Sequence, residues 1–190
     1  MQQLFAFALV LVTSSAHAAT YFVSTVTQFN CIASSLQPGD EVVVQNGTYN
    51  GTFVNAVVAA SGTVNNPVVI RAQTPYGVKL SGTSDSRFFV LAGNHITLRG
   101  FDFQSALSSH SSVVDVAGSH VRITGNRFLD SGNAVADARM IQVQPIASHT
   151  LIDHNYFRGS RSISIGTANS DTQGAQHTHI HHNIFRDFTR

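Results

Sequence analysis

The chain has 190 residues, of which 11% are charged, and its formal net charge is +1. A charge this small provides no global field to recruit nucleic acid or an anionic membrane, so any polyanion has to bind at a local patch. The single cysteine, Cys31, excludes an internal disulfide framework and a cysteine-based zinc site, and we expect it to be buried as a small apolar residue.

The N-terminus is typical of a secretory signal peptide. Residues 4–13 form an apolar run, which is followed by small residues and by Ala16-His17-Ala18, although the first three residues include no Lys or Arg. The run is too short for a transmembrane helix, which needs about 20 apolar residues. We therefore interpret residues 1–18 as a signal peptide, rather than as an N-terminal core segment, and expect the protein to be exported to the periplasm or the cell exterior.

The next part of the chain predicts one helix followed by strands. Residues 27–36 have the amphipathic pattern of a short helix, with Thr27 as N-cap and Pro38-Gly39-Asp40 as the stop signal. The pairs Asn46-Gly47 and Asn50-Gly51 are interpreted as turns between strands. The predicted strands are residues 41–45, 67–72, 88–92 and 113–116.

Four copies of one repeat follow. Each copy begins with His, has Leu or Ile three residues later and Phe eight residues later, and places Ile, Val or Thr directly after the His. This period of two predicts a strand with one inward face. The copies are residues 95–103, 120–128, 149–157 and 177–185.

A short strand cannot bury its inward face alone, but strands stacked about 4.8 Å apart in a solenoid share a continuous core. Asn126, Asn155 and Asn183 share one repeat position at the bend after the strand. Asn tolerates left-handed backbone geometry there, and its amide can bond to the next coil as a ladder. We therefore predict an all-β domain over residues 19–190, a right-handed parallel β-helix (a single-stranded solenoid) with a short N-terminal capping helix.

Four segments carry a resemblance to a known family: residues 36–49, 66–72, 95–103 and 151–157. They resemble polysaccharide lyase family 6, which contains alginate lyases and chondroitinase B and has a pectin-lyase-like fold. The Pro-Gly-Asp and Asn-Gly-Thr-Tyr elements of the first segment, in this order, are moderately specific. The later repeats would suit many β-helix proteins.

The resemblance implies a β-elimination on an acidic polysaccharide. A Lys helped by an Arg would remove the C5 proton of a uronate, while a calcium ion held by Asn and Glu neutralises the sugar carboxylate. Departure of the C4-linked sugar leaves an unsaturated uronate. The implied partner is a uronan, with alginate favoured, and neither nucleic acid nor a membrane is expected as a partner.

The side chains for this chemistry do not occur together in the sequence. The chain contains one Lys, Lys79, and one Glu, Glu41, both in its N-terminal third, and we expect both to be solvated surface charges. We therefore predict no catalytic residue, no metal ligand and no bound calcium in these 190 residues. We also expect a solenoid that is truncated after Arg190 and that self-associates or aggregates through its uncapped last coil.

Arg158 and Arg186 are the main candidates for substrate binding. Both directly follow the repeat Phe and should stack on neighbouring coils, where like charges repel unless an anion bridges them. The bridge is either a uronate carboxylate, which the Arg fork binds well, or the neighbouring Asp130 and Asp187. His110, ahead of the predicted fourth strand, is a weaker candidate.

Two groups of residues that contain histidine have alternative interpretations. His177, His179 and His181 alternate along one predicted strand, so they either bind zinc or copper together or form a polar outer face of the solenoid, which is the simpler interpretation. Asp153 and His181 share a repeat position on neighbouring coils. A cross-strand ion pair is favoured there over part of a hydrolytic site.

Two other functions stay open beside a lyase. One is a non-catalytic glycan-binding β-helix. The other is a pectinase-like glycoside hydrolase, which needs two carboxylates roughly 5 to 9.5 Å apart across a groove. Asp130 and Asp187, two coils apart in the repeat, are the pair whose spacing fits a hydrolase.

Overall fold

The computed structural model of the protein describes residues 18–82, 87–105, 112–130, 139–159, 162–165 and 175–187. Residues 1–17 of the predicted signal peptide, and the candidate His110, lie outside these ranges. Within them, no helix has the length and apolar character needed to cross a membrane.

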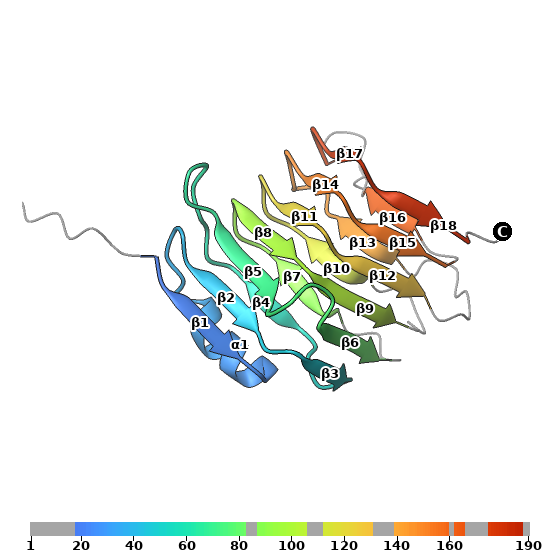
Figure 1. Cartoon of the computed structure of the whole chain (residues 1–190). Coiled ribbons are helices and arrows are strands. Elements are labelled where there is room, and N and C mark those ends of the chain that lie inside the picture. Colours follow the sequence, from blue (N-terminus) through green and yellow to red (C-terminus); the bar gives the residue numbers. More distant parts are fainter. Residues whose placement is uncertain are drawn as a thin grey trace, which may run out of the picture.

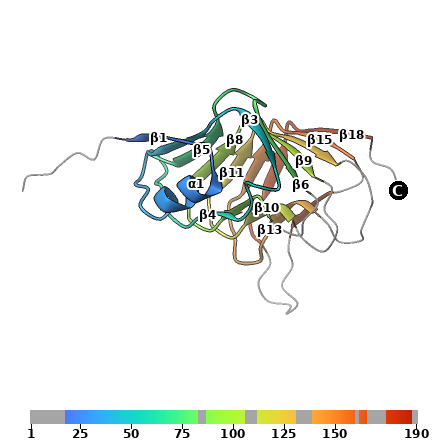
Figure 2. The ribbon, with the colours of Figure 1, turned by 90° about the horizontal axis from the view of Figure 1, so that it is seen from below.

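Three parallel sheets form a solenoid (Figures 1 and 2), and after the first strand and helix the chain visits them in the fixed order A, B, C. This is the predicted right-handed parallel β-helix. Sheet A consists of β1 (Thr20–Val23), β2 (Glu41–Val44), β5 (Val68–Ala72), β8 (Ile96–Arg99), β11 (Arg122–Thr124), β14 (Leu151–Asp153) and β17 (His179–His181). Sheet B consists of β3 (Gly47–Asn50), β6 (Val78–Gly82), β9 (Phe101–Ser105), β12 (Arg127–Asp130), β15 (Tyr156–Arg158) and β18 (Ile184–Arg186). Sheet C consists of β4 (Ala56–Val58), β7 (Phe89–Leu91), β10 (Ser112–Val116), β13 (Arg139–Val143) and β16 (Ser162–Ile165).

The helix α1 (Val26–Ala33) lies at the N-terminal end of the solenoid (Figure 2), as expected for a capping helix. Its start was predicted wrongly, because the N-cap is Thr25 and not Thr27. The Thr25 hydroxyl accepts a hydrogen bond from the backbone N–H of Gln28 at 3.1 Å, which satisfies an amide that has no partner inside the helix. The helix also ends at Ala33, three residues before the predicted Leu36.

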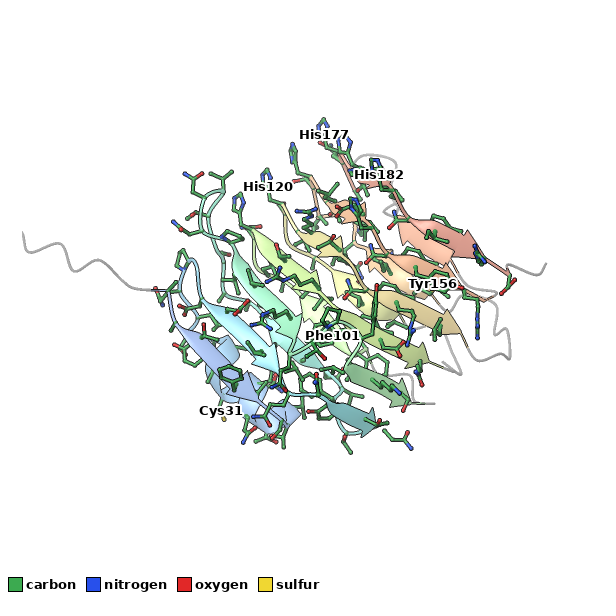
Figure 3. The ribbon with its side chains drawn as sticks, in the orientation of Figure 1. Cys31, Phe101, His120, Tyr156, His177 and His182 are labelled. Atoms are coloured by element: carbon green, nitrogen blue, oxygen red, sulfur yellow. The ribbon has the colours of Figure 1, made fainter. Side chains whose placement is uncertain are left out.

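The predicted burial of Cys31 is wrong as well, since its side chain is exposed (Figure 3). The helix buries Phe29 and Ala33 against the solenoid. Because each residue turns a helix by about 100°, Cys31 points away from the face that carries Phe29.

The predicted strands at residues 41–45, 67–72, 88–92 and 113–116 are present as β2, β5, β7 and β10. The predicted turns around residue 47 are partly wrong, because residues 47–50 form β3, which pairs in parallel with β6. Only Gly51, with φ of 65°, takes the left-handed conformation of a turn there.

A column of phenylalanine rings runs along the solenoid; its first three rings are buried in the core, and Phe185 in the last described coil is 49% exposed. The rings of Phe103, Phe128, Phe157 and Phe185 stack in sequence with centroid distances of 4.7, 4.9 and 4.9 Å. The strand register pairs the same residues from coil to coil. The predicted repeat register is therefore confirmed, and it makes the core continuous.

The predicted asparagine ladder is also confirmed. Nδ2 of Asn126 donates to Oδ1 of Asn155, and Nδ2 of Asn155 donates to Oδ1 of Asn183, both at 3.1 Å. The expected left-handed backbone falls one residue earlier in each coil, with φ of 62° at Gly125, 55° at His154 and 53° at His182 in place of the Asn. The preceding residue makes the bend, and the Asn amide points into the protein.

Candidate binding grooves on the outer face

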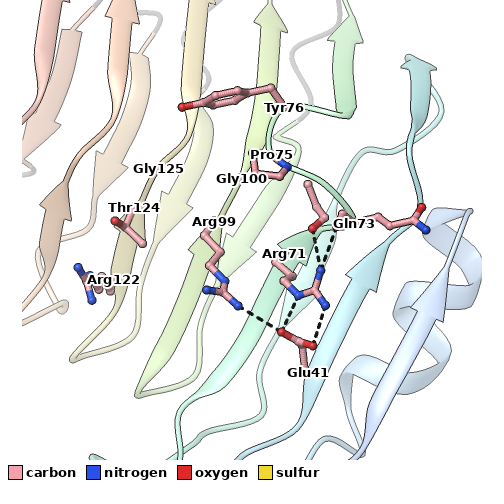
Figure 4. Close-up of a pocket in the computed structure, with 11 residues that line it drawn as sticks. Glu41, Arg71, Gln73, Pro75, Tyr76, Arg99, Gly100, Arg122, Thr124 and Gly125 are labelled. Atoms are coloured by element: carbon pink, nitrogen blue, oxygen red, sulfur yellow. Dashed lines mark hydrogen bonds and ion pairs between the residues drawn. The ribbon is translucent and has the colours of Figure 1, made fainter.

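A groove of about 690 Å³ lies on the outer face of sheet A, and we call it the sheet A groove (Figure 4). Its charged residues come from four strands that follow one another in the sheet, β2, β5, β8 and β11. Parallel pairing in register places Arg71 directly beside Arg99. The residues that line the groove are Glu41, Arg71, Ala72, Gln73, Pro75, Tyr76, Arg99, Gly100, Arg122, Thr124 and Gly125.

Glu41 is the anion that holds these arginines together. Its carboxylate accepts from Nε of Arg71 at 2.6 Å and from a second Arg71 nitrogen at 3.1 Å, and more weakly from Arg99 at 3.4 Å. The Arg71 hydrogen bonds are the main reason why the pKa of Glu41 is lowered. The expectation that Glu41 is a solvated surface charge is therefore wrong, because stacked arginines need a counter-ion.

Asp153 forms the second ion pair at this groove. It is 1% exposed and accepts two hydrogen bonds from Arg122, at 2.9 and 2.6 Å, and its Oδ2 lies 2.7 Å from Nδ1 of His154. These contacts, led by Arg122, lower the pKa of Asp153 to about 2. The predicted Asp153–His181 ion pair is wrong, although the two residues are in register. A two-pronged Arg is the stronger partner, and Nδ1 of His181 lies 2.6 Å from that of His182.

A second groove, of about 520 Å³, follows the bend from sheet A to sheet B in the later coils, and we call it the A–B groove. Arg127 is fixed at its edge by the fully buried Asp102 through two hydrogen bonds, which raise the pKa of Arg127. The guanidinium carbon of Arg127 also lies 5.1 Å from the ring centroid of Tyr76. The residues that line the groove are Tyr76, Arg127, Leu129, His154, Asn155, Tyr156, Arg158, His182 and Ile184.

The predicted stacking of Arg158 on Arg186 is confirmed by the register of β15 and β18. Both side chains are exposed, and Arg158 lines the A–B groove whereas Arg186 lies beyond it. Among the side chains that the structure describes, neither arginine forms an ion pair with a carboxylate. The side chain of Asp130, one of the two predicted bridging carboxylates, lies outside the described part.

The proposed shared face of His177, His179 and His181 is not formed. His177 precedes β17, has φ of 53° and stacks its ring on that of His149 at 4.7 Å, whereas His179 and His181 belong to the strand. His177 is instead the last of four stacked imidazoles at one corner of the solenoid (Figure 3). We call His95, His120, His149 and His177 the histidine column.

Neither groove fits the calcium site that the family resemblance implies. The carboxylates at or beside the two grooves, those of Glu41, Asp102 and Asp153, are already bound by arginines. In the described ranges, no three His, Cys, Asp or Glu side chains group to hold a metal ion. Lys79 is exposed on β6 of sheet B and lines neither groove. The single Lys and the single Glu are therefore not brought together, and no step through calcium follows from these residues.

Two features of the grooves were not predicted from the sequence. Asp102 and Arg127 each lie seven residues after a repeat His, and strand register joins them directly, so the repeat alignment already contained this ion pair. Tyr76 belongs to a bend between β5 and β6 outside the repeats, and nothing in the local sequence shows that its ring lies over Arg127.

Comparisons with known proteins agree with this architecture. Among solved structures, a polysaccharide lyase family 6 alginate lyase, AlyGC, is similar with a TM-score of 0.61 and 22% identity, covering 87% of this chain and 28% of that one. An alginate lyase from Paenibacillus sp. str. FPU-7 gives a TM-score of 0.63 at 17% identity, covering 86% and 58%. A mannuronic acid specific family 6 lyase from human gut microbiota gives 0.58 at 20%, covering 88% and 48%.

At these identities the likeness concerns the fold. The chain spans between 28% and 58% of the length of these three solved structures. A comparison with curated protein sequences finds no significant match. The family model described as chondroitinase B, however, matches residues 23–189. Since the match extends over most of its length, the chain belongs to the chondroitinase B family of polysaccharide lyases, family 6.

Proposed function

We propose that this chain is part of an enzyme that cleaves a uronan by β-elimination, with alginate as the favoured substrate. The observation that carries the proposal is the family match over residues 23–189. The similar solved structures are supporting, because two of them are described as alginate lyases and a third as a mannuronic acid specific lyase.

The part of the function that we assign to these residues is substrate binding. Arg158 and Arg186 are exposed neighbours on adjacent strands, and a uronate carboxylate between them would relieve their repulsion and satisfy both guanidinium groups. We propose that they form a uronate subsite.

We propose that the proton-abstracting Lys and the calcium ligands are supplied from outside residues 1–190. Glu41 is held by Arg71 and Arg99, and Lys79 lies on another sheet. We also propose export of the protein, which rests on the apolar run of residues 4–13 and would show as a mature N-terminus at Ala19.

The test uses the chain together with the sequence that follows Arg190 in its reading frame. This longer protein is incubated with alginate, with chondroitin and dermatan, and with polygalacturonate, and the ultraviolet absorbance of unsaturated uronate is followed. We expect absorbance to rise with alginate, to disappear with a calcium chelator and to return with added calcium. Saturated products would support a hydrolase instead, and binding without any cleavage would support a glycan-binding protein.

A further inference from the structure

The two grooves meet at Tyr76, which lines both of them. Its backbone N–H donates to the carbonyl of Gly100 at 2.7 Å, and its ring lies against the guanidinium group of Arg127. Tyr76 has φ of 60°, and its ring reaches the side chain of Arg127 on β12. The backbone of Tyr76 is therefore fixed by Gly100 and its ring by Arg127, at the junction of the sheet A groove and the A–B groove.

The corner under this ring has the same backbone conformation in four successive coils. Gly100, Gly125, His154 and His182 have φ of 82°, 62°, 55° and 53°. A Cβ atom on Gly100 would make ordinary contacts, at 3.5 Å from Cβ of Ala72 and 3.9 Å from Cα of Pro75, so it is the positive φ, and not a lack of space, that favours glycine here. In the next two coils the stacked rings of His154 and His182, 5.2 Å apart, line the A–B groove.

The arginines along this corner outnumber the carboxylates that bind them. Five arginines line the two grooves, and three carboxylates, those of Glu41, Asp102 and Asp153, are paired with them. Among the side chains that the structure describes, the path therefore carries two uncompensated positive charges. Such a surplus attracts an anionic ligand most strongly at low ionic strength, because salt screens exposed charges.

Arg99 and Arg158 keep most of their N–H groups available, in contrast to Arg71. Arg71 donates from all three nitrogens, to Glu41 and to backbone carbonyls. Arg99 makes one hydrogen bond within the described ranges, of 3.4 Å to Glu41, and its side chain is 51% exposed. Arg158 has no carboxylate partner among the described side chains. One of the available arginines thus lies in each groove.

The A–B groove also offers a flat surface for a sugar ring. Tyr156 lies between Arg127 and Ile184 in the register of sheet B, and Leu129 lines the same groove. Aromatic and aliphatic side chains provide apolar contact area, and Arg158 at the edge provides charge. A ligand that combines sugar rings with regularly spaced carboxylates matches both features.

We propose that the sheet A groove and the A–B groove form one binding track for a uronan, with carboxylates on Arg99 and Arg158 and sugar rings against Tyr76 and Tyr156. The choice of a uronan as ligand rests on the proposed function. The track contains no Lys and no free carboxylate among its lining residues. It holds the polymer along the solenoid axis and takes no part in the elimination.

Binding is tested with the 190-residue chain and saturated uronate oligosaccharides at low salt, by isothermal titration calorimetry. We expect Arg99→Gln and Arg158→Gln each to weaken binding of a long oligomer by about 5- to 10-fold, as for loss of one charged hydrogen-bonding group. Lys79→Gln removes the same charge outside both grooves and should change affinity less than about twofold. A neutral oligosaccharide of equal length should bind far more weakly.

Continuity of the track is tested by ligand length. An oligomer long enough to reach from Arg99 to Arg158 should bind more tightly than a disaccharide, and Tyr76→Asn should remove most of this gain. Asn accepts the left-handed backbone of Tyr76 and replaces the aromatic ring by a short carboxamide. Urea unfolding of each variant shows that the chain is folded, and Arg99→Lys, which keeps the charge but loses the fork, should lie between wild type and Arg99→Gln.

The track is overturned if Arg99→Gln, Arg158→Gln and Lys79→Gln bind the long oligomer alike. It is also overturned if the length of the oligomer has no effect. These results are separate from the proposed lyase activity. If the arginine variants bind more weakly but the longer protein shows no elimination, the binding track stands and the proposed lyase activity is wrong. If the longer protein shows elimination but all variants bind equally, the lyase activity stands and the binding track is wrong.

Discussion

Nδ2 of Asn126 donates a hydrogen bond to Oδ1 of Asn155 at 3.1 Å, inside the protein and between two neighbouring coils. The same oxygen accepts from the backbone N–H of Asn126 at 2.9 Å, and the Asn155 amide donates to the Ile123 carbonyl at 2.8 Å. The ladder thus satisfies backbone as well as side-chain groups where the chain bends between sheets A and B.

Asn155→Ala should lower the free energy of unfolding by about 2 to 4 kcal/mol, because it leaves buried donors and acceptors of two coils without partners. Urea unfolding of the purified chain measures the change. Asn65→Ala, at an exposed position of the turn before β5, is the matched control and should stay within about 0.5 kcal/mol of wild type. Equal stability of both variants would show that the ladder adds nothing.

Acid should destabilise the protein through Asp153. Its pKa is 3.8 in a model compound and about 2 in the folded protein, so its contribution is complete above about pH 4 and is lost as pH falls toward 2. We expect Asp153→Asn to remove about 1 to 2 kcal/mol of that pH dependence, a figure reduced because Arg122 is partly exposed to solvent. Urea unfolding at pH 5 and near pH 2.5 measures it. Asn65→Ala, at an exposed residue that carries no charge, should leave the pH dependence intact, and equal pH dependence of both variants would contradict the role given to Asp153.

The titration of His149 should depend on its neighbours in the histidine column. The pKa of His149 is lowered, first by desolvation between its neighbours and then by the charges of His120 and His177. A lowered pKa favours the neutral ring in the folded state, so the contribution of His149 to stability is present above pH 6.5 and decreases as pH falls below it. In NMR titrations, His120→Gln should raise the midpoint of His149. An unchanged midpoint would show that stacked imidazoles do not sense one another.

The side-chain contacts on the inward face of the solenoid could be predicted from the sequence, and most of those on the outward face could not. Phe103, Phe128 and Phe157 stack because every coil presents the same side chain to the same core, and repeated chemistry is visible in an alignment. Outward positions differ from coil to coil. The Arg122–Asp153 pair runs diagonally between repeat positions, so no single column of the alignment contains it.

Local geometry explains the remaining differences. Thr25 and Thr27 are both suitable N-caps, but only Thr25 is correctly spaced to pair with Gln28. The backbone N–H of Gln28 donates to the hydroxyl of Thr25, and the side-chain oxygen of Gln28 accepts from the backbone N–H of Ser24. A period-two pattern also treats each repeat His as part of its strand, whereas the positive φ of each repeat His shows that it precedes the strand. That assumption produced the wrong shared face for His177.

Replacing Arg158 and Arg186 together by Ala in the longer protein should raise KM by about 10-fold and change kcat by less than about threefold, because neither group is assigned a proton transfer. Initial rates on alginate separate the two constants. Lys79→Ala is the control and should leave both constants near wild type. A fall in kcat with an unchanged KM would move these arginines from substrate binding to the chemical step.

The most direct test is to mix the purified 190-residue chain with alginate, with and without calcium. Retention of the chain on the polysaccharide and the ultraviolet absorbance of unsaturated uronate are recorded in the same sample. We predict retention that weakens with salt and no unsaturated uronate under either condition, because Lys79 and Glu41 lie on different sheets and Glu41 is bound by Arg71. Production of unsaturated uronate by these 190 residues would contradict the account.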